Sequence, residues 1–170
     1  MLFDNNIFAA PEHFIKICAQ IKKEKLVVDF NQGLDFRLLT EDLLETMKTI
    51  RHKAYRFALD NIAYIKNADK AISLLKKHGI KKCTWYVLVG FDSTFEEDLE
   101  RLNFLRSHKQ DVFVQRYNIK ELGRKYTALA RWANQHHLFV KMTWEDFMAH
   151  PDNKSYQNSL NSRAWNGDNN

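Results

Sequence analysis

Short apolar runs alternate along this chain with amphipathic stretches of about helix length. The clearest example is residues 87–89, an unbroken apolar run of the kind found in strands that are buried on both faces of a parallel sheet. Gly90 ends this run, and Ser93 and Thr94 are each followed three residues later by a glutamate. That spacing is typical of a capped helix N-terminus. The stretch therefore predicts a strand, a turn and a helix in succession.

The same order of strand, polar turn and helix recurs at intervals of roughly 28 residues, the length of one strand-plus-helix unit. Further strands are predicted at residues 2–3, 26–30, 55–59 and 112–114, and residues 138–150 are consistent with one more strand and a short helix.

Alternation of this kind implies an α/β fold with parallel strands and right-handed crossovers. The even repeat favours a barrel over a doubly wound sheet, and a complete barrel takes about 250 residues. We therefore expect a partial, open TIM-type barrel of about five to six parallel β/α units over residues 1–150. Residues 151–170 are rich in Asn and Ser and predict a polar C-terminal tail.

Composition narrows the class of protein. The 170 residues are enough for one domain with a sizeable core, and no apolar run approaches the roughly 18 residues of a membrane span. The N-terminal residues lack the pattern of a signal peptide, so a cytoplasmic location is expected. Cys18 and Cys83 both lie in apolar patterns, as reduced core thiols do. The net charge of +5 suits RNA or another anionic partner, and it equally suits a solvated surface.

The candidate binding residues all follow predicted strands, because ligands of parallel α/β folds gather at the carboxyl ends of the strands. Their carboxylates, amides and guanidinium groups suit a polar, multi-hydroxyl or zwitterionic ligand. The same residue types also cap helices and form turns, and this structural interpretation stays open for each position. The candidates are Asp4, Asn5, Asn6, Gln32, Asp35, Arg37, Asp60, Asn61, Gly90, Asp92, Arg116, Tyr117 and Asn118.

Four stretches within residues 2–132 carry a family resemblance: FNQGLDFRLLTEDLLETM, RFALDN, WYVLVGFDSTFEEDLERLNFLR and VFVQRYN. In this order and spacing they resemble the later part of a radical S-adenosylmethionine enzyme core, especially an uncharacterised branch of that superfamily. The resemblance implies that the chain contributes the adenosyl and methionine side of the cofactor pocket.

The resemblance also implies roles for the strand ends. Residues 4–6 stand where the family places groups near the amino end of the methionine, and Arg37 is similar to a basic residue near the methionine carboxylate or the substrate. Residues 60–61 lie where a polar residue commonly contacts the ribose. Residues 89–91 resemble the strand that backs the adenine, and residues 116–118 would border the adenine or the substrate.

One departure from the family is large. The loop with three cysteines spaced CxxxCxxC is absent, and two cysteines cannot hold a [4Fe–4S] cluster in the family manner. We expect a cluster only if an upstream segment supplies it, and no radical chemistry from this chain alone, since the electron comes from the cluster. The chain is then a fragment, a split gene product or a homologue that has lost the activity. No other metal site is predicted, because His136 and His137 face different directions on a helix.

Two alternatives remain open at this stage. The first is a non-catalytic binding or scaffold module for RNA or a protein, in which an exposed sheet edge favours self-association or pairing with an upstream segment. The second is a glycosidase-like barrel using Asp35, Asp60 and Asp92, which requires carboxylates about 5 or 9 Å apart.

Overall fold

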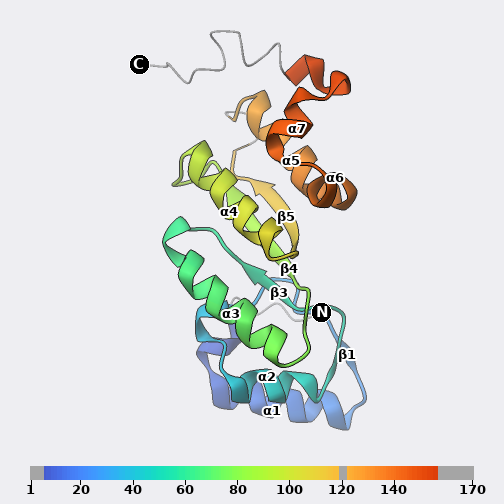
Figure 1. The fold of residues 1–170 in the computed structure, drawn as a ribbon. Helices are drawn as coiled ribbons and strands as arrows, with labels where there is room; N and C mark the ends of the chain where they lie inside the picture. The colour runs from blue at the N-terminus through green and yellow to red at the C-terminus, as the bar shows by residue number, and fades with distance from the viewer. Residues whose placement is uncertain (1–5, 119–121, 157–170) are drawn as a thin grey trace. The chain divides into compact units, whose positions relative to one another are not determined.

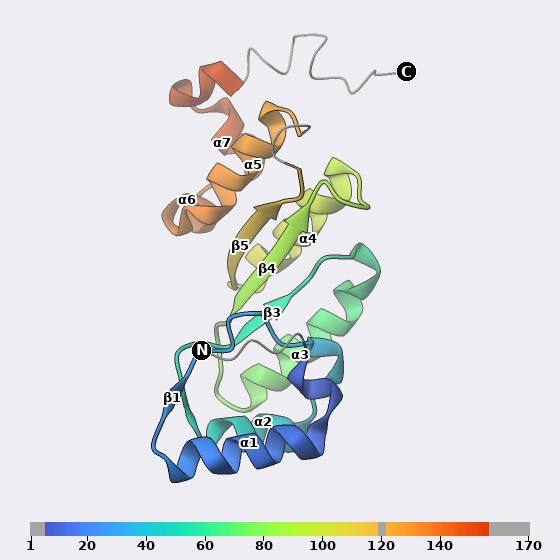
Figure 2. The ribbon, with the colours of Figure 1, turned by 180° about the vertical axis from the view of Figure 1, so that it is seen from behind.

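The computed structural model describes residues 6–118 and 122–156. In this part of the chain, short parallel strands alternate with helices (Figures 1 and 2). The strands form two small sheets, ordered β1–β2 and β3–β4–β5, and the described residues contain no closed barrel. The predicted α/β class and the alternating β/α units are therefore confirmed. The strand predicted at residues 2–3 lies outside the described residues.

The chain divides into two compact units. The first unit comprises Met1–Leu59 and Ala63–Tyr86, and the second comprises Asp60–Ile62 and Val87–Asn170. Strand β4 (Thr84–Val89) and the 3₁₀ turn η3 (Ile62–Tyr64) contribute residues to both.

The first unit contains helices α1 (Pro11–Lys23), α2 (Glu41–Lys48) and α3 (Ile65–Lys77). Its strands are β1 (Val27–Val28), β2 (Arg51–His52) and β3 (Arg56–Ala58), and 3₁₀ turns lie at η1 (Ile7–Ala9) and η2 (Phe36–Leu38). Helices α1 and α2 lie side by side in both ribbon views (Figures 1 and 2). β3 pairs in parallel with the first half of β4, with Phe57 opposite Trp85.

Periodic apolar residues explain these helices. Leu43, Leu44 and Met47 form the buried stripe of α2, whose first turn is capped by the Thr40 side chain accepting from the Leu43 N–H. On the exposed face of α2, a carboxylate oxygen of Glu45 lies 2.6 Å from Nδ1 of His78, the residue that follows α3. The core of the unit also contains close aromatic pairs, such as Phe57 with Trp85 at 5.2 Å between ring centroids.

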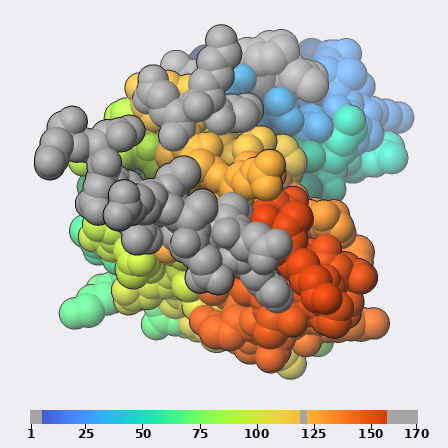
Figure 3. All heavy atoms as spheres, turned by 90° about the horizontal axis from the view of Figure 1, so that it is seen from above, coloured from blue at the N-terminus to red at the C-terminus, as the bar shows by residue number. Residues whose placement is uncertain are grey.

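The second unit contains β5 (Asp111–Arg116) and helices α4 (Phe95–Ser107), α5 (Arg124–Asn134), α6 (His136–Lys141) and α7 (Trp144–Ala149), followed by the 3₁₀ turn η4 (Pro151–Asn153). The C-terminal helices fill one continuous region of the face seen in Figure 3, in orange and red. Their core is aromatic: the centre of the Trp132 ring lies 5.0 Å from that of Phe139 and 5.8 Å from that of Trp144. No helix among the described residues is long and apolar enough to span a membrane.

One local prediction needs correction. The strand expected within residues 138–150 is wrong, because this segment forms α6 and α7: the Phe139 N–H bonds the Gln135 carbonyl, and the Phe139 ring packs on Trp132. The capped helix start predicted here is confirmed: the capping box at α4 uses Thr94 and Glu97, and the Ser93 hydroxyl donates to Asp98. In the predicted polar tail, residues 151–153 form η4 and Asn153 is buried, while residues 157–170 lie outside the described part.

Candidate functional site

Three strand-end candidates of the first unit, Asn6, Asp35 and Arg37, meet at the Asp35 carboxylate. Asp35 caps η2 and accepts from Arg37 at both oxygens, with distances of 2.8 Å to Nε and 2.7 Å to Nη2. The Arg37 backbone N–H and the Asn6 side chain also donate to Asp35, at 3.0 and 3.3 Å. The hydrogen bonds from Arg37 hold the pKa of the Asp35 carboxyl below its ordinary value. Asp35 and Arg37 therefore form a bidentate ion pair, and because their charges offset each other, the pair attracts a charged ligand only weakly.

Arg37 is also held from a second side, since its guanidinium lies 4.7 Å from the centre of the Tyr64 ring. The resemblance implies a carboxylate-binding role for Arg37, but here the fork of the guanidinium is already occupied by Asp35. Gln32 is exposed in the turn that follows Phe30. Asp4 and Asn5 lie outside the described residues.

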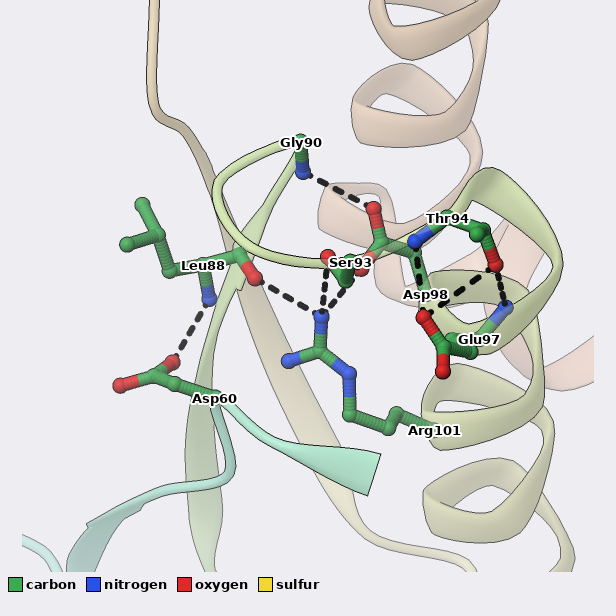
Figure 4. Close-up of polar contacts among 8 residues, drawn as sticks. All are labelled: Asp60, Leu88, Gly90, Ser93, Thr94, Glu97, Asp98 and Arg101. Atoms are coloured by element: carbon green, nitrogen blue, oxygen red, sulfur yellow. Dashed lines mark hydrogen bonds and ion pairs between the residues drawn. The ribbon is translucent and has the colours of Figure 1, made fainter. Parts of the chain in front are cut away.

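In the second unit, the end of β4 has β5 on one side and is held by side chains on the other (Figure 4). Asp60 Oδ1 accepts from the Leu88 N–H at 2.8 Å, and Arg101 Nη2 donates to the Leu88 carbonyl at 3.0 Å. The Gly90 N–H donates to Asp98 Oδ2 at 2.9 Å. Gly90 has a φ of +71°, a conformation that favours glycine. The turn after β4 is therefore fixed by helix α4 and by Asp60.

Asp98 and Arg101 form a buried ion pair beneath this turn, and both side chains are fully shielded from solvent. Asp98 also accepts from the Ser93 hydroxyl at 2.6 Å and from Tyr126. Burial, together with the negative charge of Asp98, raises the pKa of Tyr126 to about 12. A carboxylate this deep is tolerated because a cation and several donors surround it.

Sequence reasoning missed Asp98 and Arg101, although a signal was present. Both residues fall within the stripe of α4 that also carries Phe95, Leu102 and Leu105, all of which are buried. A carboxylate and an arginine three residues apart usually form an exposed helix pair. Their place in an apolar stripe indicates a buried one.

The ends of β4 and β5 meet through two aromatic side chains. The Tyr117 N–H donates to the Val89 carbonyl at 3.1 Å, which brings Tyr117 beside the residues that follow β4. The rings of Phe91 and Tyr117 lie 4.5 Å apart, and these residues are 56% and 58% exposed. An exposed aromatic pair at two adjacent strand ends is a surface on which a planar ring can stack.

The other candidates of the second unit are placed differently. Arg116 Nη1 donates to the Thr127 hydroxyl of α5 at 2.8 Å, so this side chain is held by the helix. Asn61 and Asp92 are exposed, and the Asn118 carbonyl accepts from the Leu122 N–H at 2.9 Å. The structure thus brings together residues 90–91 with Tyr117.

Neither cysteines nor other residues form a metal site in the described part of the chain. No group of three or more His, Cys, Asp or Glu side chains there can hold a metal ion. Cys18 and Cys83 are both buried, and burial raises the pKa of the Cys18 thiol to about 11. These two residues do not fit a [4Fe–4S] cluster, which needs accessible thiolates on one loop.

A small pocket in the second unit has a volume of about 100 Å³ and an apolar floor that includes Leu138, Met142 and Phe147. None of the candidate binding residues lines it. The pocket therefore adds no residue to the strand-end site.

Comparison of the chain with protein-family models, with curated proteins and with solved structures found no match.

Proposed function

We propose that this chain is part of a radical S-adenosylmethionine enzyme core and that its second unit binds the adenosyl group at the ends of β4 and β5. The observation that carries the proposal is the contact between Phe91 and Tyr117. The segment that the resemblance implies behind the adenine, residues 89–91, meets residues 116–118, which it implies beside the adenine or the substrate, at this exposed ring pair. Stacking of a nucleobase on such rings contributes about 1–3 kcal/mol per base.

The chemistry of the neighbouring groups supports an adenosyl ligand. Asp60 is exposed while one of its oxygens bonds the Leu88 N–H, so the second carboxylate oxygen is the group that would accept from ribose hydroxyls. The buried Asp98–Arg101 pair fixes the turn in front of Phe91, which limits the entropy lost when a ring stacks there. In this proposal the fold is a partial, open β/α barrel.

The chain does not run the radical reaction by itself in this proposal. An S-adenosylmethionine enzyme of this type takes its electron from an iron–sulfur cluster, and the two buried cysteines do not supply the ligands. The cluster ligands would come from a segment outside this sequence. What the present residues do is bind and orient the adenosyl group.

Titration of the ¹⁵N-labelled chain with S-adenosylhomocysteine tests the proposal. We expect shifts concentrated at the amides of Gly90, Phe91 and Tyr117, competition by adenosine, and none by methionine. Phe91→Ala should weaken binding at least fivefold, whereas Phe113→Ala, which removes a comparably exposed ring within β5, should leave it unchanged. Equal effects of the two variants, or no shifts at the strand ends, would contradict the assignment.

The exposed rings and the net charge of +5 also suit a second function, a non-catalytic module that binds single-stranded RNA. Phosphate contacts make such binding fall steeply with salt. This module is favoured over the enzyme core if the protein binds a single-stranded oligonucleotide at 50 mM salt, releases it at 200 mM, and does not bind S-adenosylhomocysteine.

A further inference from the structure

β5 is the terminal strand of its sheet among the described residues, so one of its edges faces away from β4. In a strand, the N–H and C=O of one residue point to the same side, and successive residues alternate. The Tyr117 N–H points toward β4, since it donates to the Val89 carbonyl. By this alternation, the backbone groups of Val112, Val114 and Arg116 point to the outer edge. An open edge of this kind is a template for another strand.

The outer edge of β5 is already occupied at its middle residue. Asn134, the last residue of α5, accepts from the Val114 N–H through Oδ1 at 2.6 Å and donates from Nδ2 to the Val114 carbonyl at 3.0 Å. The side-chain amide thus makes both bonds that one residue of a neighbouring strand would make. Helix α5 lies beside β5 in both ribbon views (Figures 1 and 2).

We propose that Asn134 closes the β5 edge to strand addition, so that neither a second copy of this chain nor a separate segment extends the sheet there. The inference does not depend on the proposed adenosyl site. A further strand would have to displace Asn134 from Val114. It would break the two hydrogen bonds of Asn134 and form two of its own at Val114, so it would gain no hydrogen bonds at this residue.

The carboxamide of Asn134 meets both requirements at this position. The Val114 N–H needs an acceptor and the Val114 carbonyl needs a donor, and the Asn134 amide supplies one of each. A carboxylate would satisfy the N–H and repel the carbonyl. A leucine of similar size would satisfy neither group and would leave the edge available.

Hydrogen exchange on the full chain tests the proposal directly. In the wild-type protein the Val114 amide should be protected to a degree similar to that of the Tyr117 amide, which bonds Val89. In Asn134→Leu, exchange at Val114 should be at least tenfold faster, and exchange at Tyr117 unchanged. Sedimentation velocity should show concentration-dependent dimers of Asn134→Leu that the wild type does not form.

Asn103→Leu is the matched control, because Asn103 is an exposed asparagine on α4 and its substitution adds the same apolar surface. It should change neither the exchange at Val114 nor the association state. If Asn134→Leu does not fold, Asn134→Asp replaces it and should likewise speed exchange at Val114. The proposal is wrong if the wild-type Val114 amide exchanges as fast as an unstructured one, if loss of the Asn134 amide does not speed that exchange, or if Asn134→Leu remains monomeric at every concentration.

Discussion

Replacing Arg101 with methionine would leave the Asp98 carboxylate buried without its cation. Both side chains are fully shielded, and Arg101 also donates to the Leu88 carbonyl at 3.0 Å. Removing one partner of a buried ion pair typically costs about 3–5 kcal/mol, because the remaining charge is neither solvated nor paired. Domains are stable by only about 5–15 kcal/mol, so this substitution should remove a large part of the free energy of unfolding.

The assay is urea unfolding followed by far-UV circular dichroism at neutral pH. With an m value of about 2 kcal/mol/M, a loss of 3–5 kcal/mol lowers the midpoint by roughly 1.5–2.5 M. Arg131→Met is the matched control, because Arg131 is an exposed arginine of α5 and surface substitutions usually change stability by less than about 0.5 kcal/mol.

A double variant separates the ion pair from simple packing. Asp98→Leu combined with Arg101→Met leaves no buried charge, so it should be more stable than Arg101→Met alone. The reasoning is refuted if Arg101→Met unfolds at the midpoint of the Arg131→Met control. It is equally refuted if the double variant loses the sum of the two single losses.

Two further predictions concern the turns and the first unit. Gly90→Ala should be more destabilising than Gly79→Ala in thermal unfolding: both residues have a positive φ, which costs roughly 1–2 kcal/mol with a Cβ, but only at Gly90 would that Cβ also lie 2.5 Å from Leu122. Because the pKa of Asp35 is depressed by Arg37, the stability that this pair contributes is present above the unfolded pKa of about 3.9 and is lost as pH falls through the lower folded value. Arg37→Gln should therefore be less stable than wild type at pH 7 and approach it at the acid end, as measured by urea midpoints across the pH range.

The sequence predicted the parts of the fold that depend on local pattern. The stripe of α2 and the capping box that begins at Thr94 are encoded within a few residues, and both are found as expected. Strand β2 was not predicted, because Arg51 and His52 show no apolar run and belong to the sheet only through backbone pairing with β1. Residues 138–141 have a strand-like composition, but their helix is set by packing of Phe139 on Trp132.

The candidate site was harder to predict because its bonds are long-range. The sequence placed Asp60 at a strand end, but nothing within the stretch indicates that its carboxylate would accept from the Leu88 N–H, 28 residues away. The meeting of Phe91 with Tyr117 follows from β4 and β5 being neighbours, which the alternation of strands and helices implied. The contact of the Phe91 ring with Tyr117 was nevertheless not predicted, because nothing in the sequence around residue 91 indicates which way its side chain points.

In the second unit, side chains act repeatedly as partners for backbone groups that another strand would otherwise bond. The backbone of Leu88 bonds Asp60 and Arg101, the Gly90 N–H bonds Asp98, and the Val114 N–H bonds Asn134. With these side-chain partners, a short sheet can end without unpaired backbone donors and acceptors. Unpaired backbone groups cost free energy when they are buried, and at an open strand edge they promote pairing with another chain.

This arrangement also bears on how a ligand would bind. Polar groups that are committed to the backbone have less to offer a ligand, so affinity at the strand ends should come mainly from stacking on Phe91 and Tyr117. Stacking involves no counterion release, whereas phosphate binding does. Binding of S-adenosylhomocysteine should therefore change little between 50 and 200 mM salt, and a steep salt dependence would point to charged contacts rather than to these rings.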